Sequence, residues 1–159
     1  MLINTKRCTI RPFEEKDLDD FMHYRNNTEW MQYQIYKCLT KETYREQLLQ
    51  PFSLDKLNRL AITLTSTEKV IGDLLIKKAD SKHWIGYTIA PEYARQGYAY
   101  EATSAAIQYL FQSGIQEIYA GCERANFASK CLLEKLRFKF LYEDERGYIF
   151  VLKNPTDTF

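Results

Sequence analysis

Hydrophobic and polar positions change their spacing several times along the chain, and each change predicts a secondary-structure element. Residues 8–13 alternate between apolar and polar side chains and end at a proline, which predicts a short strand. In residues 14–26, Leu18, Phe21 and Arg25 recur at helical spacing. The chain therefore opens with a strand that leads into an amphipathic helix.

A second helix and three strands follow this opening. Residues 40–50 begin with Thr40, a favourable N-cap, and end before a proline, which predicts a helix. Residues 60–66 and 69–78 are rich in Ile, Leu and Thr and are separated by two residues, the pattern of an antiparallel hairpin. Residues 82–90 read as the next strand.

From Tyr98 to Gly114, apolar residues recur every three or four positions, which predicts a helix that ends near Gly114. Residues 116–122 predict a strand, residues 126–138 a helix, and residues 140–153 two strands around a turn. This order favours an α/β (α+β) fold with a central mixed, mostly antiparallel, seven-stranded twisted sheet and helices on both faces.

Composition narrows the class of protein. The 159 residues, 45% of them hydrophobic, are enough for one core, so we expect a single domain over residues 1–159. Because 22 basic residues oppose 21 acidic ones, the net charge is +1, and we expect no binding to nucleic acid or to a membrane. Four cysteines without CxxC spacing and two histidines predict no metal site.

The first residues lack the apolar block of a signal peptide, and no uncharged apolar run approaches the ~18 residues that a membrane span needs. We therefore expect a cytoplasmic protein.

The loop before the helix at Tyr98 carries the main functional signal. A helix N-terminus presents unpaired backbone N–H groups and a partial positive charge, so it binds anions when side chains leave it open. Gly97 and Ala99 would keep it open. The chain contains neither GxxxxGK[ST] nor GxGxxG, which argues against nucleotide hydrolysis and dinucleotide binding. The alternative is that Gly97 only eases a strand-to-helix turn.

Two segments together resemble one family. Residues 84–111 (WIGYTIAPEYARQGYAYEATSAAIQYLF) and 123–140 (ERANFASKCLLEKLRFKF) are similar to the acetyl-CoA-binding half of the GNAT superfamily of N-acetyltransferases. The similarity is greatest to the branch of ribosomal-protein N-terminal alanine acetyltransferases, which residues 5–21 also fit. The resemblance implies a GNAT-like sheet whose splayed strands hold the coenzyme.

In this family the loop pattern is Arg/Gln-x-x-Gly-x-Gly/Ala, and its backbone amides cradle the pyrophosphate of the coenzyme. Gly97 and Ala99 match the pattern, whereas Ala94 stands where Arg or Gln is usual. The strand before the loop would pair with the pantetheine arm. The coenzyme-binding residues that the resemblance implies are Thr88, Ile89, Arg95, Gln96, Gly97, Tyr98, Ala99, Tyr100, Asn126, Ser129, Lys130 and Lys135.

The second segment implies catalytic roles. Asn126 and Ser129 match the positions that face the pantetheine and the thioester sulfur. Leu133 replaces the tyrosine that protonates the leaving thiolate in many relatives, so Ser129 takes that role by position. Arg137 replaces the usual glycine at the end of this helix, which is awkward if the residue must be left-handed.

An acceptor amine must lose a proton, and three residues are candidates for the base. His83 has a suitable ordinary pKa but could be a surface residue of an edge strand. Glu123 lies near the expected thioester, or is an ordinary loop carboxylate. Asp73 lies in a strand, or only pairs with a lysine. Trp84 occupies the position of the glutamate found in many relatives.

Two further residues have simpler interpretations. Glu101 lies in the first turn of a helix, where an acid complements the helix dipole, so we read it as structural. Cys122 could be close to the thioester, but direct transfer needs no covalent intermediate, and we read its thiol as inert.

Residues 23–42 would bind the acceptor, which could be a peptide N-terminus, an amino acid, a polyamine or a drug. Their aromatic side chains could equally belong to the core or to a dimer, so either a monomer or a homodimer is compatible with them. We expect an acetyl-CoA-dependent N-acetyltransferase that acetylates a primary amine of a protein N-terminus or a small molecule by direct transfer. The alternative is an acyl-CoA-binding module with little transferase activity, suggested by Trp84, Ala94 and Leu133.

Overall fold

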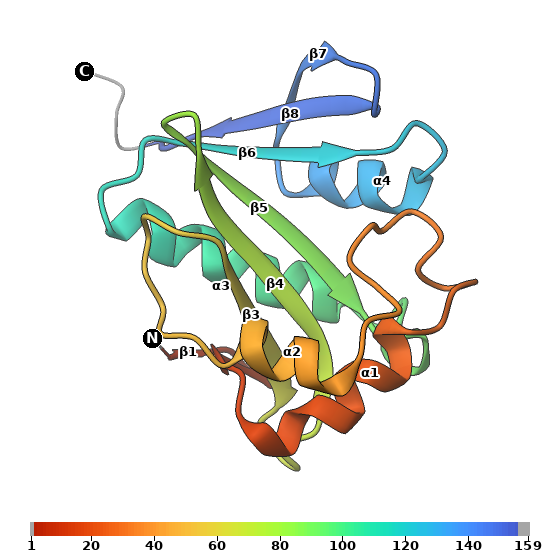
Figure 1. Cartoon of the computed structure of the whole chain (residues 1–159). Coiled ribbons are helices and arrows are strands. Elements are labelled where there is room, and N and C mark those ends of the chain that lie inside the picture. Colours follow the sequence, from red (N-terminus) through yellow and green to blue (C-terminus); the bar gives the residue numbers. More distant parts are fainter. Residues whose placement is uncertain (1, 156–159) are drawn as a thin grey trace.

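The computed structural model describes residues 2–155, in which an eight-stranded sheet carries four α-helices (Figure 1). The strand order is β1-β2-β3-β4-β5-β6-β8-β7. The strands are β1 (Ile3–Asn4), β2 (Cys8–Pro12), β3 (Asn58–Leu64), β4 (Val70–Ala79), β5 (Lys82–Ile89), β6 (Glu117–Cys122), β7 (Lys139–Glu143) and β8 (Tyr148–Lys153). The helices are α1 (Leu18–Arg25), α2 (Lys41–Leu48), α3 (Tyr98–Gln112) and α4 (Phe127–Lys135).

The predicted fold class is confirmed. Within residues 2–155 the pair β5–β6 is parallel and the other pairs are antiparallel, so the sheet is mixed and mostly antiparallel. The sheet has one strand more than the seven that the sequence predicts. The additional strand, β1, is two residues long and pairs with β2. Two residues are too few to show an alternating pattern.

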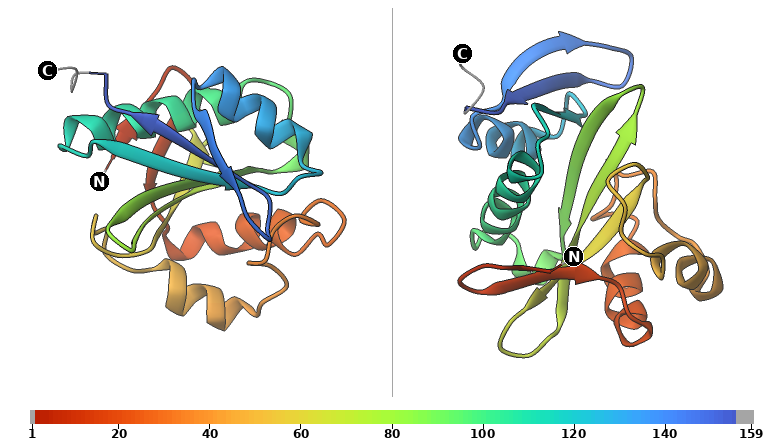
Figure 2. Two further views of the ribbon diagram at one scale, coloured as in Figure 1. Left: turned by 90° about the horizontal axis from the view of Figure 1, so that it is seen from above. Right: turned by 90° about the vertical axis from the view of Figure 1, so that its left-hand side faces the viewer.

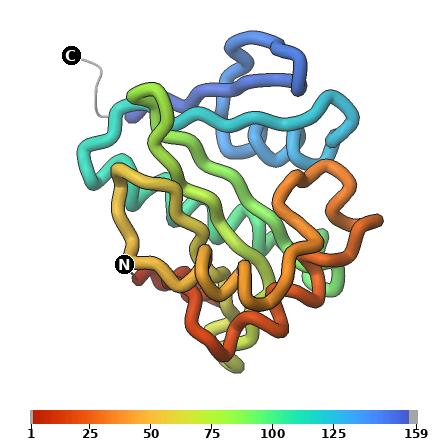
Figure 3. The backbone as a smooth tube through the Cα atoms, viewed as in Figure 1, coloured from red at the N-terminus to blue at the C-terminus, as the bar shows by residue number. Residues whose placement is uncertain are grey.

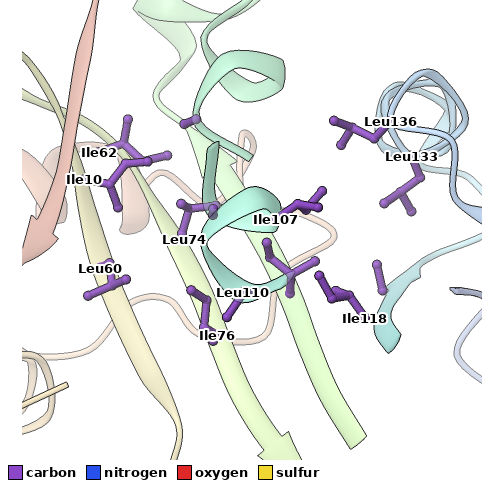
Figure 4. Close-up of a cluster of buried hydrophobic side chains, with 14 of the residues drawn as sticks. Ile10, Leu60, Ile62, Leu74, Ile76, Ile107, Leu110, Ile118, Leu133 and Leu136 are labelled. Atoms are coloured by element: carbon purple, nitrogen blue, oxygen red, sulfur yellow. The ribbon is translucent and has the colours of Figure 1, made fainter. Parts of the chain in front are cut away.

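Helices cover both faces of the sheet. The views in Figure 2 place α3 and α4 on one face and α1 and α2 on the other. The α3 side holds the larger core, drawn in Figure 4, in which Ile107 and Leu110 of α3 pack among strand residues such as Leu74 and Ile118. Leu133 contributes to the same core from α4.

The core on the other face is aromatic. Phe21 of α1 makes edge-to-face contacts with Phe13 and Tyr44, with ring centres 5.0 Å apart in each case. Tyr24 and Met31 are buried in the same cluster. This core fixes α1, α2 and the start of the connection between them against the sheet.

Candidate active site

Strands β5 and β6 run side by side for only two residue pairs. His83 pairs with Ile118 and Trp84 with Tyr119, and the described residues show no further pairing between these strands. The strands then diverge toward their C-terminal ends, as Figure 1 shows. Beyond Trp84 the edge of β5 that faces β6 therefore has backbone polar groups free for a ligand.

A cavity of about 520 Å³ lies at this divergence. Its wall is formed by the end of β5, the loop before α3, helix α4 and residues 30–34. Of the predicted coenzyme-binding residues, those that line the cavity are Thr88, Ile89, Arg95, Gly97, Tyr98, Ala99, Tyr100, Asn126, Ser129 and Lys135. Gln96 and Lys130 are not among its lining residues.

Gly97 has the conformation that its position requires. It is the N-cap of α3, with φ of +84°, in the left-handed region that favours glycine. A Cβ atom there would lie 3.3 Å from the guanidinium of Arg7. Because the cap has no side chain, the first N–H groups of α3 face the cavity without a capping partner. Arg95, two residues earlier, is also left-handed, with φ of +61°.

Glu101, in the first turn of α3, is tied to the N-terminal segment. Its carboxylate accepts hydrogen bonds from the Thr5 hydroxyl at 2.5 Å and from the backbone N–H and Nε of Arg7, each at 2.8 Å. Burial alone would raise the pKa of Glu101, but these hydrogen bonds and the charge of Arg7 lower it. The Arg7 guanidinium also lies 4.0 Å from the ring centre of Tyr98. These contacts agree with a structural role for Glu101.

The charge of the cavity wall is positive. Arg95 and Lys135 line it, and its lining residues among those described include no aspartate or glutamate. The ammonium of Lys135 lies 4.5 Å from the ring centre of Tyr100, which holds this flexible side chain at the α3 end of the cavity. The wall therefore suits an anionic ligand next to the open helix N-terminus. Lys130 instead lies over the ring of Tyr148.

A hydroxyl pair lies at the other end of the cavity. The hydroxyl of Tyr87, on β5, is 2.9 Å from Ser129 Oγ, on α4. It is also within 3.1 Å of the Ser129 carbonyl oxygen, to which it can donate. Burial raises the pKa of Tyr87. The hydrogen bond with Ser129 lowers it by a smaller amount, so the pKa remains above the ordinary value of a tyrosine. Asn126 caps α4, because its Oδ1 accepts the Ser129 N–H at 3.2 Å.

The three candidate bases lie in different places. His83 is on the paired start of β5, six residues before Ile89, and does not line the cavity. Glu123 is exposed just after the end of β6 and, like His83, does not line the cavity. Its carbonyl oxygen accepts the Asn126 N–H at 3.0 Å. Asp73 is buried and pairs with arginines rather than with a lysine.

The departures from the family pattern have local consequences. Leu133 is buried in the core, as Figure 4 shows, so no polar group stands in place of the family tyrosine. Trp84 packs on Tyr119, with ring centres 5.4 Å apart. Arg137 is left-handed, with φ of +73°, the conformation in which an arginine is less favourable than the usual glycine. Burial raises the pKa of the Cys122 thiol, which disfavours the nucleophilic thiolate.

The expected acceptor segment, residues 23–42, lies against the end of β5, as the tube in Figure 3 shows. The indole N–H of Trp30 donates to the Ile89 carbonyl oxygen at 2.9 Å, so a side chain occupies one of the backbone groups predicted to face pantetheine. Trp30 and Tyr33 line the cavity, whereas Tyr24 is buried in the aromatic core.

No pattern in the sequence indicates Tyr87 as a site residue or the contact of Trp30 with Ile89. Tyr87 lies within the segment GYTIA, but alternation along a strand reveals only that it points away from the face of Thr88. Its partner, Ser129, is 42 residues away, and no local pattern links them.

No group of three or more His, Cys, Asp or Glu side chains within residues 2–155 is placed to hold a metal ion. None of the helices in that range is long and apolar enough to span a bilayer.

Comparison with known proteins gives consistent results. The family model described as acetyltransferase (GNAT) domain matches residues 7–139. A Bacillus subtilis protein described as an uncharacterized N-acetyltransferase, YnaD, is 29% identical over 139 residues, which cover 86% of this chain and 81% of the relative.

Solved structures share the fold. A GNAT-family acetyltransferase from Bacillus anthracis superposes with a TM-score of 0.83 at 23% identity, over 97% of this chain and 99% of that one. A ribosomal L7/L12 alpha-N-protein acetyltransferase in complex with coenzyme A superposes with a TM-score of 0.80 at 16% identity, over 99% and 100% of the two chains.

Proposed function

The chain belongs to the GNAT acetyltransferase family, and on that premise we propose that it moves an acetyl group from acetyl-CoA directly to a primary amine. The observation that carries the proposal is the cavity at the divergence of β5 and β6, which joins free strand edges to an uncapped helix N-terminus. An elongated ligand with an anionic end and an amide-containing arm fits these two features. The coenzyme A in the structure of a protein with the same fold supports this ligand.

The anionic end of the coenzyme lies, in this proposal, at Gly97. Backbone N–H groups at the start of α3 would bind the pyrophosphate, and Arg95 and Lys135 would add charge. Ala94 lines the cavity but contributes no polar or charged group to this binding. The backbone thus supplies most of the recognition, which is why a residue without a side chain is needed at the cap.

Ser129 is the proposed donor to the leaving thiolate. Its hydroxyl lines the cavity, and the Tyr87 hydroxyl at 2.9 Å orients it. Tyr87 is a positioning residue here, because its hydroxyl lies against both Ser129 Oγ and the Ser129 carbonyl oxygen. Asn126 fixes the first turn of α4 through its cap and so places Ser129.

Proton removal from the amine is assigned to Glu123, which would act through water because it is not among the residues that line the cavity. Glu123 follows β6 directly, three residues before Asn126, whereas His83 is about 20 Å along β5 from Ile89 at the usual strand rise. Glu123→Gln is expected to lower kcat and to change its pH profile. His83→Gln is expected to leave both unchanged, and the reverse pattern would transfer the role to His83.

A screen of primary amines with acetyl-CoA and thiol detection tests the function. We expect release of coenzyme A that depends on the amine, with peptide N-termini and small amines as separate arms. Saturable acetyl-CoA binding without thiol release from any amine would instead identify an acyl-CoA-binding module. No binding of acetyl-CoA would reject both functions.

A further inference from the structure

A buried ionic cluster lies on the face of the sheet that α1 and α2 cover. Arg25 Nη2 donates to both carboxylate oxygens of Asp73, on β4, at 2.7 Å to Oδ1 and 2.6 Å to Oδ2. The same carboxylate accepts a hydrogen bond from Arg59 Nη1, on β3, at 3.1 Å. It also accepts one from the Tyr24 hydroxyl at 2.5 Å. The side chains of Arg25 and Asp73 are 0% and 1% exposed, and that of Arg59 is 13% exposed.

The charges of this cluster do not balance. Two guanidinium groups share one carboxylate, and no other carboxylate within residues 2–155 forms an ion pair with either arginine. Aromatic rings partly compensate: the ring centre of Tyr36 lies 4.3 Å from the guanidinium carbon of Arg59 and 5.8 Å from that of Arg25. One positive charge therefore remains without an anionic partner in a mostly buried site.

A second cavity, of about 320 Å³, opens beside this excess charge. Arg59 is part of its wall, together with Tyr36, Gln47, Leu48 and Leu57. Arg59 uses one nitrogen for Asp73, so its remaining N–H groups can serve another acceptor. The two leucines offer apolar surface, and Leu57 is 62% exposed.

We propose that this second cavity binds a carboxylate group of the acetyl acceptor through Arg59. Arginine suits this task, because its planar guanidinium binds carboxylates in a fixed geometry and its charge is permanent. The methylene groups that carry the carboxylate would lie against Leu48 and Leu57.

The link to the acceptor rests on the proposed transfer function and on the sheet register. Thr88, which lines the coenzyme cavity, pairs with Asp73, and Asp73 pairs with Ala61. Arg59 is two residues from Ala61 and therefore on the same face. Two strand spacings and two residues along a strand separate Thr88 from Arg59 by about 12 Å. The second cavity therefore lies near the first on one face of the sheet, and the acceptor in this proposal is an amine whose carboxylate is on the order of 10 Å away.

Binding of glutarate tests the site without any assumption about catalysis. By calorimetry we expect saturable binding of glutarate but not of neutral glutaramide, and at least tenfold weaker glutarate binding to Arg59→Gln. Lys78→Gln removes one exposed charge from the neighbouring strand and serves as the matched control, with unchanged binding. Equal glutarate binding by wild type and Arg59→Gln overturns the proposal.

Leu57→Glu gives an independent test that leaves the buried cluster intact. A carboxylate introduced at the wall should occupy the site, so glutarate binding should fall at least tenfold and the melting temperature should rise. Undiminished glutarate binding by Leu57→Glu contradicts the proposed position of the site.

Acceptor kinetics then identify the source of the carboxylate. One arm compares Ala-Ala-Glu-amide with Ala-Ala-Gln-amide, and the other compares the free and amidated C-termini of Ala-Ala-Gln. We expect kcat/KM at least tenfold higher for the acidic member of one pair, and Arg59→Gln should abolish that preference. Glutarate binding without preference in either pair refutes the acceptor role. If no peptide or amine is acetylated, the proposed transferase function is refuted. The glutarate titrations still test, independently of that result, whether the second cavity binds a carboxylate.

Discussion

The cavity at the divergence of β5 and β6 and the buried Arg25–Asp73 cluster hold charge in opposite ways. The cavity relies on backbone N–H groups at Gly97 and on two exposed cations, and all of these can be reached from water. The Arg25–Asp73 pair relies on two side chains that are 0% and 1% exposed, and it joins α1 to β4, 48 positions later in the chain. The first arrangement can exchange ligands, whereas the second fixes the fold. A mutation of Gly97 should therefore affect binding, whereas a mutation of Asp73 should affect stability.

The largest effect on stability is expected for Asp73→Asn. This change leaves Arg25 and Arg59 buried without a counter-ion, at a cost of about 3–5 kcal/mol. Urea unfolding measures it. The control is Glu15→Gln, which breaks an exposed pair with Arg45 and should cost less than about 1 kcal/mol. Equal losses in the two variants would contradict the assigned role of the cluster.

The free energy of unfolding should depend on pH because of the same carboxylate, that of Asp73. Burial alone would raise the pKa of Asp73, but Arg25 and Arg59 hold it below the ordinary value. Because the folded pKa is lowered, the stabilisation is present above the unfolded value of about 3.9 and is lost as the pH falls through the folded value. The Asp73→Asn variant should lack this loss of stability at low pH. If its unfolding free energy falls with acid as in the wild type, the loss belongs to other carboxylates.

In the cavity at the divergence of β5 and β6, the largest effect on activity is expected for Ser129→Ala. Loss of one donor to the leaving thiolate should lower kcat by roughly 10 to 1,000-fold and leave acetyl-CoA affinity within a few-fold. Tyr87→Phe, which removes only the orienting hydroxyl, should lower kcat by less. Cys131→Ala, on the exposed face of the same helix, and Cys122→Ala should retain most activity. Full activity of Ser129→Ala, or an acetylated Cys122 that turns over, would reject direct transfer with this donor.

Gly97→Val should weaken acetyl-CoA binding by more than tenfold, about 1.4 kcal/mol. Gly114→Val is the matched control, because Gly114 follows the opposite end of α3, has φ of +95° and has no atom within 4 Å of an added Cβ. Both variants strain a left-handed residue, but only Gly97 faces the cavity. If a folded Gly97→Val protein binds normally, the glycine serves the turn alone.

The smallest expected effect is a gain in stability. Arg137 follows α4 in the left-handed conformation, and the N–H groups of Arg137 and Phe138 donate to the carbonyl oxygens of Glu134 and Leu133, as in a Schellman motif. Arg137→Gly should therefore stabilise the protein by about 1 kcal/mol. Glu134→Gly, inside the helix, should destabilise it by a similar amount. A loss of stability in Arg137→Gly would mean that the arginine side chain makes a favourable contact.

The same contrast explains what could be predicted from the sequence. Helix α3, its bare N-cap and the hairpin β3–β4 follow from local spacing and turn chemistry, which neighbouring residues determine. Arg25 was placed on the periodic face of its helix, but that pattern carries no information about its partner Asp73, 48 positions away. The pair Tyr87–Ser129 was missed for the same reason, since tertiary packing alone brings β5 to α4.

Calorimetric titration of acetyl-CoA, NAD and ATP into the protein tests most directly whether the divergence of β5 and β6 is a coenzyme A site. Backbone cradling of a pyrophosphate combined with strand-edge binding of an amide-containing arm predicts that acetyl-CoA binds at least ten times more tightly than NAD or ATP. Comparable affinity for NAD would contradict the account, because NAD offers a pyrophosphate but no pantetheine arm.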